Sequence, residues 1–334
     1  MRLARLLLPL LGPLTSWPIG LFPPTVLVAQ APTTMPAMPA MPRPDGFRVY
    51  VLTDMEGLAS VVFNREIISG YEGERYRNAS SQDYWQFYRG ILTREVNAAI
   101  AGARRGGARS FVVNEGHGGN LFGSILPWDL DTAALLVRGW PKPMVMSTGL
   151  DSSAGAAIFL GMHAGAGTPG VIAHTYAFDS ITVNGHWLNE TGINALVAGE
   201  YGVPVVMVTG DDVMARQAHD QLGPNIMCVV TKLAIGRNAA VAWSPAVVRQ
   251  MLQDSAMVAV RRAVRGEIQP FTLPKPYTVE FTLRASYPQE YVTATDSLPG
   301  FHLEKTGERS YRFITSDARE MARLFDAIEL IVLR

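Results

Sequence analysis

From Phe47 onward the chain alternates between short apolar runs and longer helical segments, and this alternation constrains its fold more than any other feature. Apolar runs of strand length lie at 47–53, 109–115, 143–150, 155–163, 170–178 and 203–212. Helical segments separate several of them, as at 80–108 and 189–202. Uninterrupted apolar strands are typical of a parallel sheet, because helices cover both of its faces. The sequence therefore predicts an α/β fold with a mostly parallel sheet.

The last third of the chain has a different pattern. The segment 244–264 predicts a long helix, with Ser244 as N-cap and Pro245 at the first helical position. It is followed by two alternating strand patterns and a final helix, at 277–283, 310–316 and 316–333. We therefore expect a catalytic α/β domain over 47–239 and a smaller α+β domain over 240–334.

The N-terminus is expected to lie outside the fold. The run "MRLARLLLPLLGPL" joins two arginines to a leucine-rich stretch, and Ala29 and Ala31 form an A-x-A pattern. These features predict a signal peptide over 1–31 and a periplasmic or secreted protein. An uncleaved membrane anchor is the alternative, but five prolines within 1–31 disfavour a spanning helix. The Pro-, Met- and Ala-rich stretch 32–46 predicts an extended linker.

Composition narrows the classes of partner. The chain carries 29 basic and 29 acidic residues, so its formal net charge is zero. A nucleic-acid partner would call for a basic surplus, so none is expected. Once the signal peptide is removed, we expect no membrane partner either. Cys228 is the only cysteine, which excludes an intrachain disulfide, and its apolar setting predicts a buried structural thiol.

Residues able to bind metal follow several of the predicted strands. Asp54 and Glu56 follow the first, His117 the second and His163 the fourth, while His174 lies in the next run. The carboxyl ends of parallel strands meet at one edge of a sheet, so these side chains can converge. A lone histidine there is more commonly an ordinary hydrogen-bonded residue, and neither H-E-x-x-H nor paired C-x-x-C occurs. If these side chains do converge on a cation, the cation would explain why Asp54 and Glu56 follow an apolar strand.

The motifs "LTDMEG", "VVNEGHGGN", "GAAIFLGMHAGAGTPGVIAHT" and "NETGINALVAGEYGVPVVMVTGDD" occur in this order. Together they resemble the zinc-dependent D-aminopeptidases of the DppA type, metallopeptidase family fifty-five. The resemblance runs from about Arg48 to the C-terminus and is looser after Ala240. One departure is "NEGH", where the family pattern is closer to N-D-S-H. His117 is kept, so the ligand is retained although its local hydrogen bonding differs.

The resemblance implies a centre of two zinc ions held by Asp54, Glu56, His117, His163 and Glu190. We expect Asp54 to bridge the ions, and the resemblance makes His174 a catalytic residue that is not a ligand. It implies an aminopeptidase that releases N-terminal D-residues, such as D-Ala, from short peptides through a metal-activated water. It also implies a homo-oligomeric ring.

Some residues and functions stay open at this stage. Asp211 and Asp212 are expected to cap a helix. Lys232 and Arg237 could meet a substrate carboxylate or a neighbouring subunit, or be solvated or structural, and His186 could line the pocket. The rival functions are a metal-dependent hydrolase of other amides or phosphate esters and a non-catalytic periplasmic peptide-binding protein.

Overall fold

The computed structural model of the protein describes residues 40–68, 79–118 and 123–332, except for the side chains of 79–83 and 332. The predicted signal peptide, 1–31, and the first part of the predicted linker lie outside the described residues. Residues 40–47 form neither helix nor strand. Within the described part of the chain, no helix is both long enough and apolar enough to cross a membrane.

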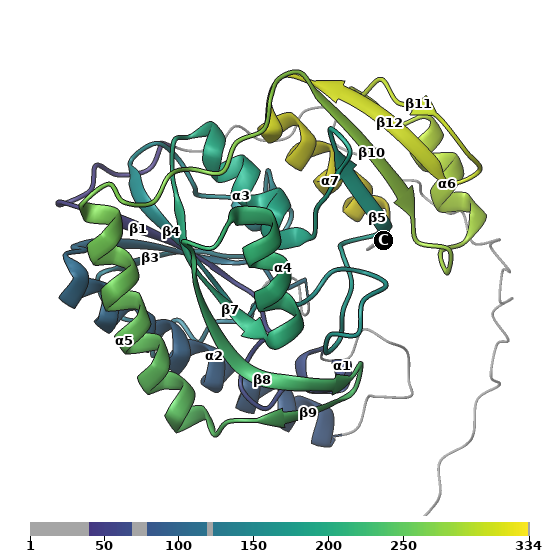
Figure 1. Cartoon of the computed structure of the whole chain (residues 1–334). Helices are drawn as coiled ribbons and strands as arrows, with labels where there is room; N and C mark the ends of the chain where they lie inside the picture. Colours follow the sequence, from purple (N-terminus) through teal and green to yellow (C-terminus); the bar gives the residue numbers. More distant parts are fainter. Residues whose placement is uncertain (1–39, 69–78, 119–122, 333–334) are drawn as a thin grey trace, which may run out of the picture. The chain divides into compact units, whose positions relative to one another are not determined.

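A seven-stranded sheet forms the main body, in the order β3-β2-β1-β4-β7-β8-β9 (Figure 1). Its strands are β1 (Arg48–Thr53), β2 (Ser110–Glu115), β3 (Ala134–Val137), β4 (Ala154–Leu160), β7 (Val205–Asp211), β8 (Met227–Gly236) and β9 (Ala239–Ala242). Every neighbouring pair is parallel except β8 with β9, which form an antiparallel hairpin at the edge. The predicted mostly parallel sheet is confirmed.

Helices cover both faces of this sheet (Figure 1). The helices are α1 (Asn64–Ile67), α2 (Ala79–Gly106), α3 (Glu190–Glu200), α4 (Asp212–Leu222) and α5 (Pro245–Val264). Successive side chains of a strand point to opposite faces, and β1 shows the result. Val49 and Val51 pack with α2 and α5, whereas Tyr50 and Leu52 pack with α3 and α4. This double burial explains why the strands read as uninterrupted apolar runs.

A second sheet is antiparallel, in the order β11-β12-β10-β5-β6. Its strands are β5 (Phe178–Val183), β6 (His186–Trp187), β10 (Tyr277–Leu283), β11 (Glu304–Lys305) and β12 (Ser310–Thr315), accompanied by α6 (Gln289–Asp296) and α7 (Ala318–Val332). Alternate β10 residues are buried, and an aromatic cluster that includes Phe178 and Phe281 packs against Phe325 of α7. The predicted α+β part of the chain is therefore present.

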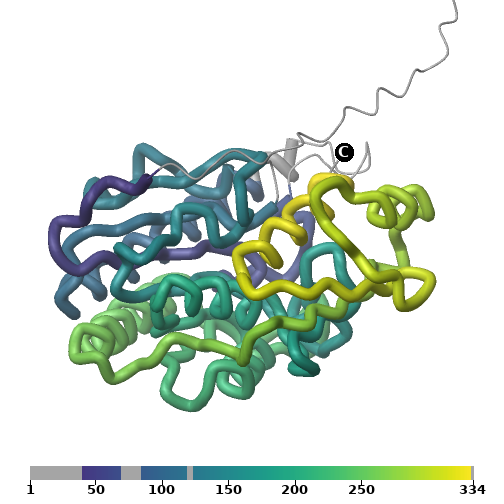
Figure 2. Tube along the Cα trace, turned by 90° about the horizontal axis from the view of Figure 1, so that it is seen from above, coloured from purple at the N-terminus to yellow at the C-terminus, as the bar shows by residue number. Residues whose placement is uncertain are grey.

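The division expected at residue 240 does not coincide with the division between the two sheets. Strands β5 and β6 precede it yet belong to the second sheet, because β5 pairs with β10 through contacts such as Ile181 with Phe281. Conversely, α5 follows it yet packs on the first sheet. Figure 2 shows the C-terminal segments lying beside residues from the middle of the chain.

Two of the expected strands are wrong. The stretch 143–150 contains only a short 3-10 helix, η3 (Val145–Ser147), and 170–178 is a loop that ends where β5 begins. Both segments contain residues with positive φ: Met144 and Val145 in the first, and Ile172 and Tyr176 in the second. An extended strand does not allow positive φ at such residues. The expected helix over 244–264 is confirmed, including Ser244 as N-cap and Pro245 in the first turn.

Candidate metal centre

The candidate metal-binding residues meet at the carboxyl edge of the seven-stranded sheet. Thr53 pairs with both Glu115 and Leu160, so β1, β2 and β4 end at the same level. The residues just beyond these ends are Asp54, Glu56, His117 and His163. Glu190 is the first residue of α3, and His174 lies in the loop before β5. All of the metal-binding and catalytic residues expected from the sequence are thus brought to one place.

The first of two side-chain groups consists of Asp54, Glu56 and His117, and we call it the carboxylate-rich group. Nδ1 of His117 lies 3.2 Å from Oδ1 of Asp54 and 3.2 Å from Oε2 of Glu56. All three side chains are at most 5% exposed. Such deep burial of two adjacent carboxylates is costly, and it favours protonation of one of them or a positive charge beside them.

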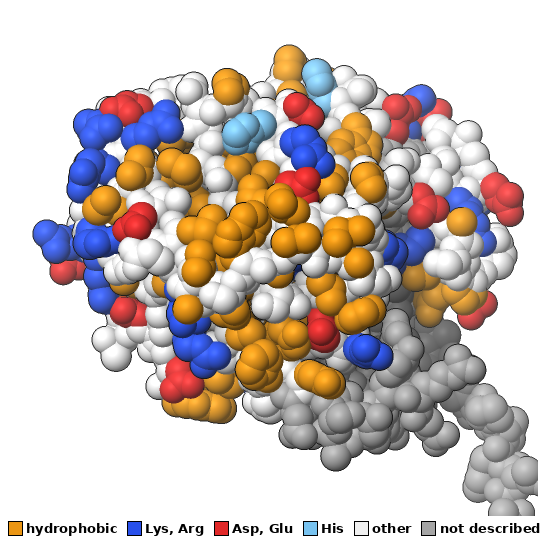
Figure 3. Space-filling view, turned by 60° about the horizontal axis from the view of Figure 1, so that its bottom comes forward, with side chains coloured by type: hydrophobic (Ala, Val, Ile, Leu, Met, Phe, Trp, Pro, Cys, Tyr) orange, Lys and Arg blue, Asp and Glu red, His pale blue; other side chains and the backbone are white. Residues whose placement is uncertain are grey.

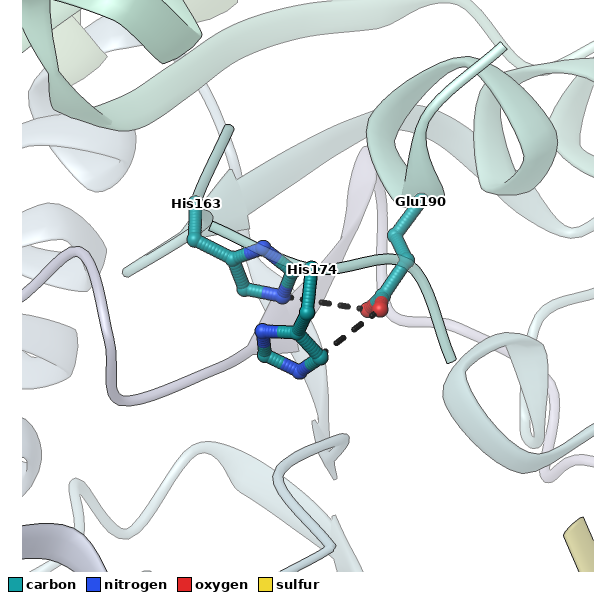
Figure 4. A group of neighbouring side chains, drawn as sticks. All are labelled: His163, His174 and Glu190. Atoms are coloured by element: carbon teal, nitrogen blue, oxygen red, sulfur yellow. Dashed lines mark ion pairs between the residues drawn. The ribbon is translucent and has the colours of Figure 1, made fainter. Parts of the chain in front are cut away.

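The second group consists of His163, His174 and Glu190, and we call it the histidine-rich group (Figure 4). Nε2 of His163 lies 3.4 Å from Oε2 of Glu190, and Nε2 of His174 lies 3.9 Å from Oε1. The two imidazole rings are stacked, with centroids 3.9 Å apart. His174 is the most accessible member, because its side chain is 27% exposed while those of His163 and Glu190 are at most 4% exposed.

Asp54 faces both groups at once. Its Oδ1 is 3.2 Å from Nδ1 of His117, and its Oδ2 is 3.4 Å from Nε2 of His163. One carboxylate that turns an oxygen to each side has the arrangement of a bridging ligand between two ions. This placement is compatible with the bridging role expected for Asp54, which stays a prediction.

Backbone carbonyls fix the orientation of all three imidazoles. Ile67, Ala164 and Ile172 provide these carbonyls, at 2.9 Å from Nε2 of His117, 3.0 Å from Nδ1 of His163 and 2.8 Å from Nδ1 of His174. A carbonyl only accepts hydrogen bonds, so each of these nitrogens carries a proton, and the opposite nitrogen of each ring faces the carboxylates, where a bound metal would take its lone pair. Metal-binding histidines are typically fixed in this way. Nε2 of His163 is buried and lies 3.4 Å from a carboxylate oxygen of Asp54 and from one of Glu190, so a metal bound to it would also contact these carboxylates.

The spacing of the donor atoms fits zinc. Zinc binds imidazole nitrogen and carboxylate oxygen at about 2.1 Å, so two ligands at a tetrahedral angle lie about 3.4 Å apart. The separations between the imidazole nitrogens and the carboxylates of Asp54, Glu56 and Glu190 are 3.2 to 3.4 Å, apart from the longer contact of His174. The donor set and its spacing therefore suit zinc on both sides of Asp54.

Charge is unevenly distributed across the centre. Burial and the neighbouring Glu56 raise the pKa of Asp54 to about 7. Burial opposes ionisation of Glu56, but His117 holds its pKa well below its ordinary value. Burial would lower the pKa of His163, but Glu190 raises it to about 10. Burial and the charge of His163 lower the pKa of His174 to about 4, so that imidazole is neutral near pH 7.

Glycine allows the two ligand-bearing loops to lie in direct contact. The Gly57 amide donates to the carbonyl of Gly161 at 2.7 Å, and the Asp54 amide donates to Leu160 at 2.7 Å. A Cβ on Gly57 would lie 2.1 Å from the carbonyl oxygen of Met162. This distance is too short for any side chain, so only glycine fits here. The glycine after Glu56 is therefore required for the loops of Glu56 and His163 to meet.

Other expectations have mixed outcomes. Asp211 does cap α4, accepting from the Met214 amide at 2.7 Å, and it also accepts from Val171 in the loop of His174. His186 is exposed on β6. Its exposure does not support the expectation that it lines the substrate pocket. Cys228 is half-buried, and burial raises the pKa of its thiol to about 12, which fits a structural role.

Sequence reasoning missed contacts made by the backbone. The Tyr176 amide donates to Oε1 of Glu190 at 2.6 Å, and the Ile67 carbonyl accepts from His117. Every residue has an amide and a carbonyl, so no residue type marks these positions. Lys232 was noticed as a basic residue, but no nearby residue pattern predicts that its side chain contacts the loop that carries Glu56.

A parallel α/β sheet whose strand ends carry a buried histidine–carboxylate centre defines the class of the protein as a metallohydrolase. The family model of the D-aminopeptidases, Peptidase_M55, matches residues 47–327. A D-aminopeptidase of Bacillus subtilis (strain 168) is 33% identical over 277 residues, which cover 82% of this chain and 93% of the relative. The chain belongs to the D-aminopeptidase family, peptidase family M55, and is a metallo-aminopeptidase. This membership decides against a non-catalytic peptide-binding protein.

A solved structure has the same fold. It is described as "Zn-dependent D-aminopeptidase DppA from Bacillus subtilis, a self-compartmentalizing protease" and superposes with a TM-score of 0.73 at 29% identity. The match covers 86% of this chain and 97% of the other. The two-sheet architecture is therefore shared with that protein.

Proposed function

We propose that this chain is a two-zinc aminopeptidase that releases N-terminal D-residues, such as D-Ala, from short peptides. The observation that carries the two-ion centre is Asp54, whose oxygens lie 3.2 Å from Nδ1 of His117 and 3.4 Å from Nε2 of His163. The preference for D-residues is supported by the family and by the relatives named above. The solved structure, which is described as Zn-dependent, supports zinc as the metal.

In the proposed reaction, the metal would activate the carbonyl and the water, and His174 would transfer a proton. A bound zinc pair would supply Lewis acidity, which polarises the scissile carbonyl and acidifies a water. His174 is neutral near pH 7 because its pKa is about 4, and its Nε2 is the unprotonated nitrogen, since Nδ1 donates to the Ile172 carbonyl. Nε2 is therefore placed to accept a proton and to pass it to the departing amine.

The first test measures zinc in the purified mature chain together with hydrolysis of D-Ala and L-Ala p-nitroanilides, before and after chelation. We expect about two zinc ions per chain, and D-Ala release that stops on chelation and returns when zinc is added. Absence of both bound metal and restored activity would contradict the proposal. Zinc binding with no D-Ala release would retain the metal centre and redirect the search to other amides or to phosphate esters.

We further propose that the protein is exported, as a periplasmic or secreted enzyme. The basis is the sequence of residues 1–31 alone. Fractionation of cells that produce the full chain, followed by N-terminal sequencing, tests this proposal. A mature N-terminus near Pro32 in the periplasm or medium is expected. An uncleaved chain that remains with the membrane would contradict removal of the signal.

We also propose a homo-oligomer formed through the outer face of the β8–β9 hairpin. The exposed fractions of Leu233, Ile235, Val241 and Trp243 are 43%, 71%, 59% and 37%, and Leu233 pairs directly with Val241 across the hairpin. Figure 3 shows hydrophobic side chains gathered on the side of the molecule where this edge hairpin lies. An apolar, unpaired sheet edge favours association with another chain. The relative described as self-compartmentalizing supports a second copy as partner.

Light scattering of the wild type and of Ile235→Glu tests the assembly. The wild type is expected to be oligomeric, and the variant to shift toward smaller species, because a buried charge destabilises an interface. Ile314→Glu is the matched control, since Ile314 is 61% exposed on β12, in the other sheet. A wild-type monomer would contradict assembly, and an unchanged oligomer in Ile235→Glu would move the interface elsewhere.

A further inference from the structure

The β8–β9 hairpin turns two basic side chains toward the loops of the metal centre. Lys232 contacts the loop that carries Glu56, and Arg237 contacts the loop that carries His174. We propose that Lys232 and Arg237 are positioning residues, each of which holds one part of the centre in its working geometry. This inference rests on the proposed two-zinc function.

Lys232 is fully buried, at 0% exposure. Its Nζ donates to the carbonyl of Glu56, to that of Leu58 at 3.0 Å and to that of Val61 at 2.6 Å. An ammonium has three N–H donors, and three carbonyls accept them here. The ammonium therefore holds together three carbonyls that would repel one another, which keeps the 56–61 loop folded inward.

A buried charge is costly, so an apolar residue would be the simpler choice if packing were the only need. Neighbouring side chains hold the same loop. Thr231 Oγ1 donates to the Gly57 carbonyl at 2.6 Å, and Oε1 of Glu95 accepts from the Ala59 amide at 3.3 Å. These contacts surround the backbone directly after Glu56. They fix the residue whose carboxylate must stay 3.2 Å from Nδ1 of His117.

Arg237 lies in the turn of the hairpin. Its guanidinium donates to the Ala173 carbonyl, and its own carbonyl accepts from the Ile172 amide at 2.9 Å. Ile172 has positive φ, at 50°, a conformation that is costly for a β-branched residue and needs outside support. The Ile172 carbonyl in turn lies 2.8 Å from Nδ1 of His174. Arg237 therefore holds the backbone that orients the catalytic imidazole.

The two contacts have different consequences. Removal of the Lys232 ammonium releases the Glu56 loop and should weaken metal binding. Removal of the Arg237 guanidinium releases the His174 loop, so the reaction should slow while the metal stays bound. This separation distinguishes positioning from a general contribution to stability, since lower stability would affect both properties together.

The test uses the full mature chain as Lys232→Met, which keeps the length of the side chain and removes its charge. Hydrogen exchange of the zinc-free protein is measured first, because it depends on neither metal nor substrate. Amides of 55–62 are expected to exchange faster than in the wild type, and those of β10 to stay unchanged. Chelator competition is then expected to show zinc bound about tenfold more weakly. Lys275→Met is the matched control, because Lys275 is half-exposed and paired with Glu200.

Arg237→Gln is measured in parallel. We expect kcat for D-Ala p-nitroanilide to fall about tenfold, as when a catalytic group is misplaced, with KM, zinc content and zinc affinity unchanged. If Lys232→Met does not fold, Thr231→Val replaces it, since that change removes the bond to Gly57 and keeps the shape.

Unchanged exchange at 55–62, or unchanged zinc affinity in a wild type that binds zinc, would overturn the role of Lys232. Loss of zinc from Arg237→Gln, or an unchanged kcat, would overturn the role of Arg237. A wild type without zinc would contradict the proposed function instead, and hydrogen exchange would still decide whether Lys232 holds the loop.

Discussion

The two halves of the metal centre differ in charge and in accessibility. The carboxylate-rich group has two acids and one imidazole, all at most 5% exposed. The histidine-rich group has two imidazoles and one acid, and it includes His174, whose side chain is 27% exposed. Buried acids bind a cation strongly, whereas an accessible neutral imidazole can exchange protons with a substrate. Under the proposed function, the first half would mainly hold metal and the second half would also take part in the reaction.

The scaffolding of the halves differs too. Asp54, Glu56 and His117 follow β1 and β2, neighbouring strands in the middle of the seven-stranded sheet. Glu190 begins α3, and His174 lies in the loop that leads to β5 of the second sheet. His174 and Glu190 therefore lie where the chain passes between the two sheets, as is typical of substrate sites, whereas His163 follows β4 of the first sheet.

The largest effect is expected from Asp54→Asn, because Asp54 belongs to the carboxylate-rich group and also faces His163 of the histidine-rich group. Loss of the shared negative charge should release both ions, and activity should fall at least about a thousandfold. Elemental analysis and D-Ala p-nitroanilide hydrolysis measure the two effects. Asp254→Asn, an exposed acid on α5 paired with Arg105, should change neither. A variant that keeps two ions would show that Asp54 is no bridge.

His174→Ala should separate reaction from metal binding. Activity is expected to fall about a hundredfold or more through loss of the proton acceptor, while both ions remain. His186→Ala serves as the control, since His186 is exposed on β6. If one ion is lost from His174→Ala, then His174 is a ligand, and the histidine-rich group holds metal as strongly as the other.

Glu56→Gln and Glu190→Gln compare the halves directly. Each change removes a carboxylate ligand from one side of Asp54, so each should weaken one ion by more than the roughly 10- to 100-fold typical of losing an outer hydrogen-bond partner, and leave the other ion bound. Zinc titration with a competing chelator resolves the two affinities. Simultaneous loss of both ions in either variant would mean that the halves cannot be filled separately.

The last prediction concerns stability behind the carboxylate-rich group and leaves the reaction itself untouched. Glu95 is fully buried, and burial raises its pKa from 4.5 to about 8. Its folded pKa exceeds the unfolded value, so the contribution of Glu95 to stability is greatest below about pH 4.5 and is lost as the pH rises through 8. In Glu95→Gln the decline between pH 5 and 8 should shrink by on the order of 3 kcal/mol. Urea unfolding of the zinc-free wild type and of Glu95→Gln at pH 5 and at pH 8 measures the decline in stability. An equal decline in the two proteins would show that Glu95 is not its cause.

Local patterns predicted much of the first sheet and less of the second. The apolar runs at β1, β2, β4 and β7 were recognisable because both faces are buried, and Ser244 with Pro245 marked the start of α5. The β8–β9 hairpin was missed. Its outer face is apolar and exposed at Leu233 and Ile235, so the strand lacks the polar alternation of a solvated edge. The loop 170–178 was mistaken for a strand because its apolar residues are buried without being extended.

The sequence by itself supplied the candidate donors: an acid pair after one strand and a histidine after each of two others, with Glu190 implied by the resemblance to the family. Parallel strands end at a common edge, so the convergence of these side chains was predictable. Only the tertiary structure decided that Asp54 turns one oxygen to each histidine, that Lys232 points inward, and that β5 joins the second sheet. These features depend on the register of strands and on contacts between distant segments, which neighbouring residues do not encode.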